Sequence, residues 1–261
     1  INRGVLLEIE ILFLLFAAPA ILFAGISKGG FGSGAAFAAA PFLATIIDPK
    51  IAIGLMLPLL MLMDLTGLYF YWKKWLKSLA IVLILGGIPG VGLGALFFSY
   101  ANPYLLKVMI GFIAILFIIH RLTAKSTYLR FSNRLLSGNV GYFWAILSGF
   151  TSCISHAGGP PAAIYLLSKN ISKTEYQATT IIVFWVINIF KLCPFLYFGF
   201  ITLDTMKISL LLAPVALFGT WLGYRMHYLL SEEKFYFIIN LLLFMTGLKL
   251  VYDGCIGLFA F

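Results

Sequence analysis

Two polar residues stand beside glycine-rich breaks in otherwise apolar runs, and both could bind a ligand. Lys28 is the one ionisable residue between Ile11 and Ile47, and it opens the stretch KGGFGSG. His156 lies in a second break, SHAGGPP. A lysine contributes a full positive charge and a histidine a hydrogen-bond donor that can titrate. The two breaks therefore favour the binding of a small anion.

The glycines beside these residues could add backbone donors. A helix that begins inside the membrane points free N–H groups and the positive end of its dipole at its first turn. Glycine lets a ligand approach that backbone closely. We therefore expect the substrate to be bound by Lys28, Gly29, Gly30, Gly32, His156, Gly158 and Gly159.

The same residues could instead have purely structural roles. Glycines also let membrane helices pack closely, and this packing role is favoured for Gly90, Gly94, Gly219 and Gly223. The ammonium of Lys28 could reach a membrane interface. The imidazole of His156 could simply pack or cap a helix.

Three further polar residues lie deep in apolar segments. Asp64 is in the middle of 51–72, Lys191 is late in 175–199, and Asn188 is about one turn before Lys191. A buried ionisable group in a membrane is costly unless it is paired or hydrated, so it is a functional candidate by default. We expect gating or ion coupling from Asp64, Asn188 and Lys191. Asp64 could pair with Lys191, carry a coupling proton, or lie near an interface.

The composition fixes the class of protein. Hydrophobic residues make up 62% of the 261 residues and charged residues 10%, with a mean hydropathy of +1.04. Soluble domains are nearer 45–50% apolar and 25% charged, so the chain is expected to be an all-α polytopic protein of the lipid bilayer. The net charge of +9 comes from basic residues scattered between apolar runs, which indicates membrane topology and no nucleic-acid partner.

About ten apolar segments can be read along the chain, and several begin with cap chemistry. Asp48-Pro49 and Asn102-Pro103 place a capping side chain before a proline, and Ser172 with Glu175 forms a capping box. The segments are 5–27, 31–47, 51–72, 78–98, 104–121, 138–155, 158–168, 175–199, 205–228 and 235–258.

The segments divide into two halves that look like repeats. Residues 23–43 align with 147–167 without a gap, placing Gly25 on Gly149, and the Gly90 and Gly219 GxxxG motifs also correspond. About five segments per half is an odd number, so the second half should be inverted in the membrane. Segments 31–47 and 158–168 are short and follow the glycine-rich breaks, as in transporters whose broken or re-entrant helices form the binding site.

Charge predicts the orientation and the division of the chain. Eleven of the 18 basic residues fall on one side under this topology, including Lys73, Lys74 and Arg130, so that side is expected to be cytoplasmic. The hydrophilic stretch after the fifth segment is typical of a linker. We therefore expect an N-terminal transmembrane repeat (1–122), a cytoplasmic linker (123–137) and a C-terminal transmembrane repeat (138–261).

The glycine arrangement resembles a known family. The pattern G-x-x-x-G-G-x-G-x-G followed by a small-residue helix (Gly25 to Pro41), its degenerate echo (Gly149 to Pro161), and the Pro/Gly-rich later segments of each half are similar to the sulfite exporter TauE/SafE family. The likeness spans nearly the whole chain. It implies transport of sulfite or organosulfur anions such as sulfoacetate, with the glycine-rich breaks near the substrate path. Lys28 and the His156-to-Pro161 region depart from the usual pattern and leave the precise substrate open.

These observations favour a secondary transporter, expected to export small inorganic or organosulfur anions from the cell across the inner (plasma) membrane by alternating access. An anion channel, a carboxylate transporter and an integral-membrane enzyme are the alternatives, and the assembly could be a homodimer. No enzyme activity, cofactor or metal ion is expected. Three scattered histidines (His120, His156, His227) and nine acidic residues form no metal or nucleophile constellation.

Overall fold

A computed structural model of the chain describes residues 3–31, 38–100, 102–131, 138–167, 169, 171–227, 229 and 232–259. Gly32, one of the expected site residues, lies outside this part of the chain. Every regular element within it is helical. In chain order the helices are α1 (Arg3–Ile26), η1 (Ser27–Phe31), α2 (Ala39–Ala44), α3 (Pro49–Phe70), α4 (Lys77–Phe98), α5 (Pro103–Phe131), α6 (Gly138–Ser155), α7 (Gly159–Leu167), α8 (Lys173–Tyr197), α9 (Leu203–Met226) and α10 (Glu232–Phe259).

The helix starts follow the cap chemistry of the sequence. Asp48 accepts a hydrogen bond from the N–H of Lys50, and Asn102 accepts one from the N–H of Leu105. Ser172 and Glu175 form the predicted capping box at the start of α8. These side chains satisfy N–H groups that a helix start leaves without intrahelical partners, so the local sequence alone places these boundaries.

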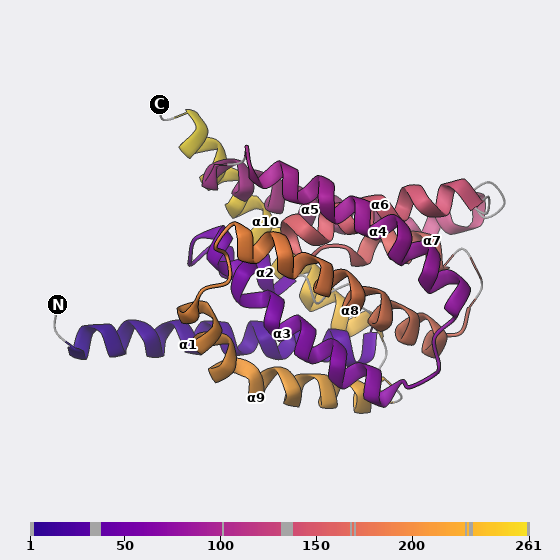
Figure 1. Ribbon diagram of the computed structural model, residues 1–261, viewed down its shortest axis with the longest axis horizontal. Helices are drawn as coiled ribbons and strands as arrows, with labels where there is room; N and C mark the ends of the chain where they lie inside the picture. Colours follow the sequence, from indigo (N-terminus) through magenta and orange to yellow (C-terminus); the bar gives the residue numbers. More distant parts are fainter. Residues whose placement is uncertain are drawn as a thin grey trace.

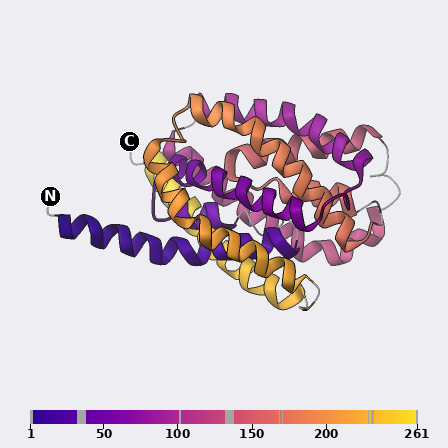
Figure 2. The same ribbon diagram turned by 60° about the horizontal axis from the view of Figure 1, so that its bottom comes forward.

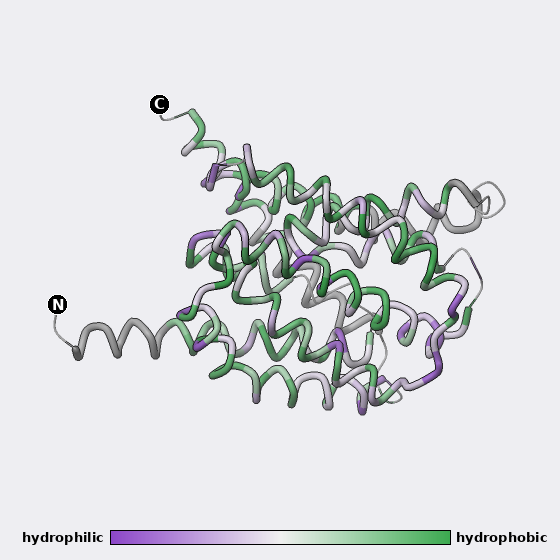
Figure 3. Tube along the Cα trace, viewed as in Figure 1, coloured by the Kyte–Doolittle hydropathy of each residue, from purple (hydrophilic) through white to green (hydrophobic). Residues whose placement is uncertain are grey.

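The helices are long and apolar enough to cross a membrane. Within the described residues, five candidate spans are Phe13–Phe31, Pro49–Phe70, Lys77–Phe98, Lys173–Tyr197 and Leu203–Met226, and two shorter apolar helices cover Pro103–Leu116 and Val140–Ser155. Hydrophobic residues predominate along the coloured helical segments of Figure 3, whereas hydrophilic residues are frequent at connections such as the one between α3 and α4. The protein is therefore a multi-pass helical membrane protein.

Helices of the first five segments pack on helices of the last five in an exchanged pattern. Helix α1 lies along α9, and its sequence counterpart α6 lies along α4. Helices α3 and α8 contact each other in the middle of the bundle, and α5 pairs with α10 (Figures 1 and 2). This reciprocity is what a two-fold repeat requires. The inversion of the halves across a membrane remains a prediction.

Glycines make the two exchanged contacts close. A Cβ added to Gly25 of α1 would come within 3.0 Å of the backbone of Gly219 in α9. A Cβ on Gly149 of α6 would overlap the carbonyl oxygen of Gly87 in α4, and one on Gly90 would overlap that of Ile146. Gly90 and Gly219 therefore have the packing role, because the neighbouring backbone occupies the space of a side chain.

The segment after the first glycine-rich break differs from the prediction. Instead of a helix over 31–47, the chain continues α1 as a π-helical turn, η1, and α2 covers only six residues. The predicted segment 31–47 has its first residue, Phe31, in this continuing turn, and Gly29 and Gly30 lie within the same turn. At the other end of the half, α5 extends to Phe131, into the segment predicted as a linker. The remainder of that segment, 132–137, lies outside the described residues.

Candidate functional site

Lys28 and Asp64 form a buried ion pair near the middle of the bundle. The Lys28 ammonium, in η1, contacts the Asp64 carboxylate of α3 and donates to the carbonyl of Leu60 at 3.4 Å. Both side chains are buried, with Asp64 fully shielded. Asp64 therefore has Lys28 as its direct counter-ion, and not Lys191, which was one of the alternatives that the sequence left open.

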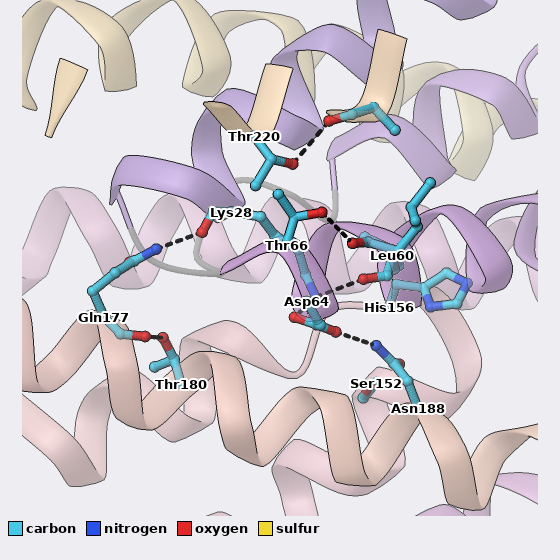
Figure 4. Close-up of polar contacts among 12 residues, drawn as sticks. Lys28, Leu60, Asp64, Thr66, Ser152, His156, Gln177, Thr180, Asn188 and Thr220 are labelled. Carbon is cyan, nitrogen blue, oxygen red and sulfur yellow. Dashed lines mark hydrogen bonds and ion pairs between the residues drawn. The ribbon is translucent and has the colours of Figure 1, made fainter. Parts of the chain in front are cut away.

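Asn188 connects this pair to the second buried lysine. Its Nδ2 donates to the second carboxylate oxygen of Asp64 at 2.8 Å, and its Oδ1 accepts from the Lys191 ammonium at 3.2 Å. Figure 4 shows the Asn188 side chain reaching from α8 towards Asp64. One amide thus joins the acidic group of the first half to the basic group of the second.

Lys191 is fully buried and has three neutral acceptors. It contacts Ser152 Oγ at 3.3 Å, His156 Nδ1 at 2.7 Å and Asn188 Oδ1 at 3.2 Å, and its ammonium lies 5.5 Å from the centre of the Phe195 ring. An ammonium has three N–H donors, so these acceptors match the charged form. The described residues provide this ammonium with no direct carboxylate contact.

His156 directly follows Ser155, the last residue of α6, and its imidazole contacts Lys191. Its backbone φ is +56°, a left-handed conformation that stops the helix and directs the chain towards α7. The ring Nε2 lies 2.8 Å from the carbonyl oxygen of Ile53, which can only accept, so the proton is assigned to Nε2. Nδ1 is then free to accept from Lys191. This assignment makes the imidazole neutral.

The second glycine-rich break places a helix start near these groups. Helix α7 begins at Gly159, and the next two residues, Pro160 and Pro161, have no N–H. The carbonyl oxygen of Gly158 accepts from Ser148 Oγ at 2.7 Å, which fixes the break to α6. The backbone donors that this start could offer a ligand are therefore the N–H groups of Gly158 and Gly159.

The first break presents backbone carbonyl groups, whereas the second presents backbone N–H groups. Side chains from three other parts of the chain pair with consecutive carbonyls: Gln177 with Lys28, Tyr71 with Gly29 (2.9 Å), and His227 with Gly30. Figure 4 shows the contact between Gln177 and the Lys28 backbone. The carbonyl end of a helix carries partial negative charge, so this turn is poorly suited to hold an anion.

Glycine at the first break serves close packing. A Cβ on Gly29 would overlap the carbonyl oxygen of Thr220, and one on Gly30 would overlap that of Gly223, both in α9. Both glycines thus have the packing role that membrane helices commonly give to glycine. A donor role of Gly29 and Gly30 towards a substrate stays a prediction that the packing does not favour.

Several participating residues were not anticipated from the sequence. Ser148 and Ser152 of α6 contact the second break and Lys191, and Gln177 and Tyr71 hold the first break. A signal for the α6 pair was present: Ser148, Thr151, Ser152 and Ser155 follow the spacing i, i+3, i+4 and i+7, which places them on one helix face. No comparable spacing marks Gln177 or Tyr71.

Comparison with known proteins gives one match. The family model described as "Sulfite exporter TauE/SafE" matches residues 17–250, which include both breaks and all the buried polar residues described above. No curated protein and no solved structure matches the chain.

Proposed function

Because the chain belongs to the sulfite exporter TauE/SafE family, we propose that it is a secondary transporter that exports small sulfur-containing anions across the plasma membrane. Sulfite, sulfoacetate and other sulfonates are the proposed substrates. The family match and the membrane-spanning helices support this function. Export as the direction of transport follows from the family alone.

The observation that carries the proposal is Lys191. A fully buried ammonium surrounded by neutral acceptors is costly to maintain in a membrane protein, and such groups mark ion and substrate pathways. In this proposal Lys191 binds the anion and the neutral imidazole of His156 orients it. The N–H groups of Gly158 and Gly159 add dipolar donors from the start of α7.

The position of the network suits alternating access. It joins Lys28 and Asp64 of the first half to Asn188, Lys191 and His156 of the second. Movement of one half against the other would break and remake these contacts around a fixed site, as in transporters built from repeats. The Asp64 and Asn188 contacts are then the proposed gate.

Transport in proteoliposomes tests the proposal. Purified protein should catalyse saturable counterflow of labelled sulfite, which a channel would not. Lys191→Met should lower the rate at least about thirtyfold, because removing one partner of a buried charged contact costs about 2–5 kcal/mol. Lys207→Met, at an exposed lysine paired with Asp204, is the matched control and should leave the rate unchanged. Equal rates in wild type and Lys191→Met would contradict the proposal.

A further inference from the structure

The buried charges of the described residues do not balance. Lys28 and Lys191 are buried cations, and Asp64 is the buried acidic residue. The contacts of His156 assign it a neutral ring, and His227 contacts the carbonyl of Gly30 at the first break. Residues 32–37 carry no ionisable side chain in the sequence. Among the side chains whose burial the structure describes, one positive charge therefore remains without an acidic partner.

We infer that the site selects its substrate by charge and takes an anion with one negative charge. Asp64 sets this charge, because its carboxylate leaves the described buried residues with a net charge of +1. The inference rests on the proposed function and narrows its substrate class. Monovalent sulfonates and hydrogensulfite fit the count. Sulfate and fully deprotonated sulfite carry two negative charges and do not fit; the inference also removes sulfoacetate, which carries two, from the substrates proposed above.

The physical basis is the cost of an unbalanced charge away from water. Charges removed from water are stabilised only by nearby opposite charges and well-placed hydrogen bonds. A monovalent anion beside Lys191 completes the balance, since Lys28 and Asp64 already neutralise each other. A divalent anion would leave one negative charge unmatched, and the start of α7 contributes only about half a positive charge.

The contacts of Lys191 indicate where the anion would bind. Its distances to Ser152 Oγ (3.3 Å) and Asn188 Oδ1 (3.2 Å) are longer than the 2.7 Å to His156 Nδ1. An anion oxygen that replaces Ser152 or Asn188 exchanges a neutral acceptor for a charged one, which strengthens the hydrogen bond. Asp64 takes no part in this exchange, because the Lys28 ammonium holds its Oδ1.

Ligand-induced thermal stabilisation of the detergent-solubilised protein tests the charge rule. Potassium methanesulfonate is the monovalent probe and potassium sulfate the divalent one, titrated at equal ionic strength. Wild type should bind methanesulfonate at least about tenfold more tightly than sulfate. Sulfate also stabilises proteins non-specifically, so the shift measured with Lys191→Met is subtracted for each salt.

Variants that alter the net charge of the buried residues should change which anion is preferred. Asp64→Asn raises the buried charge by one and should move the preference towards sulfate by at least about tenfold. The double variant Lys28→Met/Asp64→Asn removes one charge of each sign, so it should restore the preference for methanesulfonate. The double variant leaves no unpaired ion at the first break, so its preference between the two anions can still be measured if Asp64→Asn does not fold.

The outcomes separate this inference from the proposed function. Equal or tighter binding of sulfate by wild type, or a preference for sulfate in the double variant, would overturn the charge rule while sulfite counterflow continued. Loss of counterflow in the wild type would instead overturn the proposed function. A preference for methanesulfonate that disappears in Asp64→Asn and returns in the double variant would support the inference.

Discussion

The two glycine-rich breaks look alike in the sequence but end their helices in opposite ways. At the first, η1 continues α1 and its carbonyl groups are held by side chains from elsewhere in the chain. At the second, α6 stops at Ser155, and α7 starts three residues after His156. The first break thus presents acceptors that are already occupied, whereas the second presents a helix start.

The charges beside the breaks differ in the same way. Lys28 has a carboxylate partner, Asp64, whereas the three hydrogen-bond partners of Lys191 are neutral. The two glycine-rich breaks, each in contact with a buried lysine, are therefore two different kinds of site. In our proposal, the first stabilises the bundle and the second keeps a positive charge available for a ligand. The following predictions test this contrast.

The largest expected difference concerns the two lysines. Lys28→Met should lower the free energy of unfolding by about 3–5 kcal/mol, because it leaves the Asp64 carboxylate buried and unpaired. Lys191→Met removes an unbalanced charge, so its loss should be clearly smaller. Unfolding in detergent, followed by circular dichroism, measures both. Equal losses would mean that the two lysines have the same structural role.

The glycines of the first break should tolerate no side chain. Gly29→Ala or Gly30→Ala should destabilise the protein by about 1–3 kcal/mol, because the new methyl overlaps backbone oxygens of α9. Gly92→Ala in α4 is the matched control, since a Cβ there meets nothing within 4 Å, and it should stabilise by up to about 1 kcal/mol through helix propensity. Similar midpoints of thermal unfolding for all three variants would exclude the close contact.

Removing one carbonyl partner tests how the first break is held. Tyr71→Phe deletes the hydroxyl that donates to Gly29 and should cost about 1–2 kcal/mol, since a buried carbonyl loses its partner. Tyr69→Phe, at an 80% exposed neighbour, should be close to neutral. Hydrogen exchange at the end of α1 should also speed up in Tyr71→Phe only. Unchanged exchange there would show that the hydroxyl does not fasten the turn.

The smallest expected effect is the stability cost of the positive φ at His156 in the second break. His156→Gly and His156→Ala both delete the imidazole, but only glycine adopts the φ of +56° without strain. The glycine variant should therefore be more stable than the alanine variant by about 1 kcal/mol. Denaturation midpoints compared under one detergent condition measure this difference. Equal midpoints would indicate that the turn relaxes when the side chain is removed.

Most of the fold could be predicted from local sequence. The helix starts at Pro49 and Pro103 and the capping box at Ser172 can be predicted because capping depends on residues a few positions apart. The short α7 was also predicted to within about two residues. The π-helical continuation of α1 was not, because the glycines there respond to α9, a helix almost 200 residues away.

Local sequence patterns were enough to show that this is a helical membrane protein and to indicate some of its buried polar residues, such as Lys28, Asp64 and Lys191, because hydropathy and capping act over one or two helical turns. Only the tertiary structure decided which of those residues meet. Asp64 and Asn188 are 124 positions apart and Lys28 and Asp64 are 36 apart. Their contacts depend on which faces of η1, α3 and α8 pack together, and no short-range pattern encodes that choice. The division of two similar breaks into a stabilising ion pair and an unbalanced lysine is a consequence of that packing.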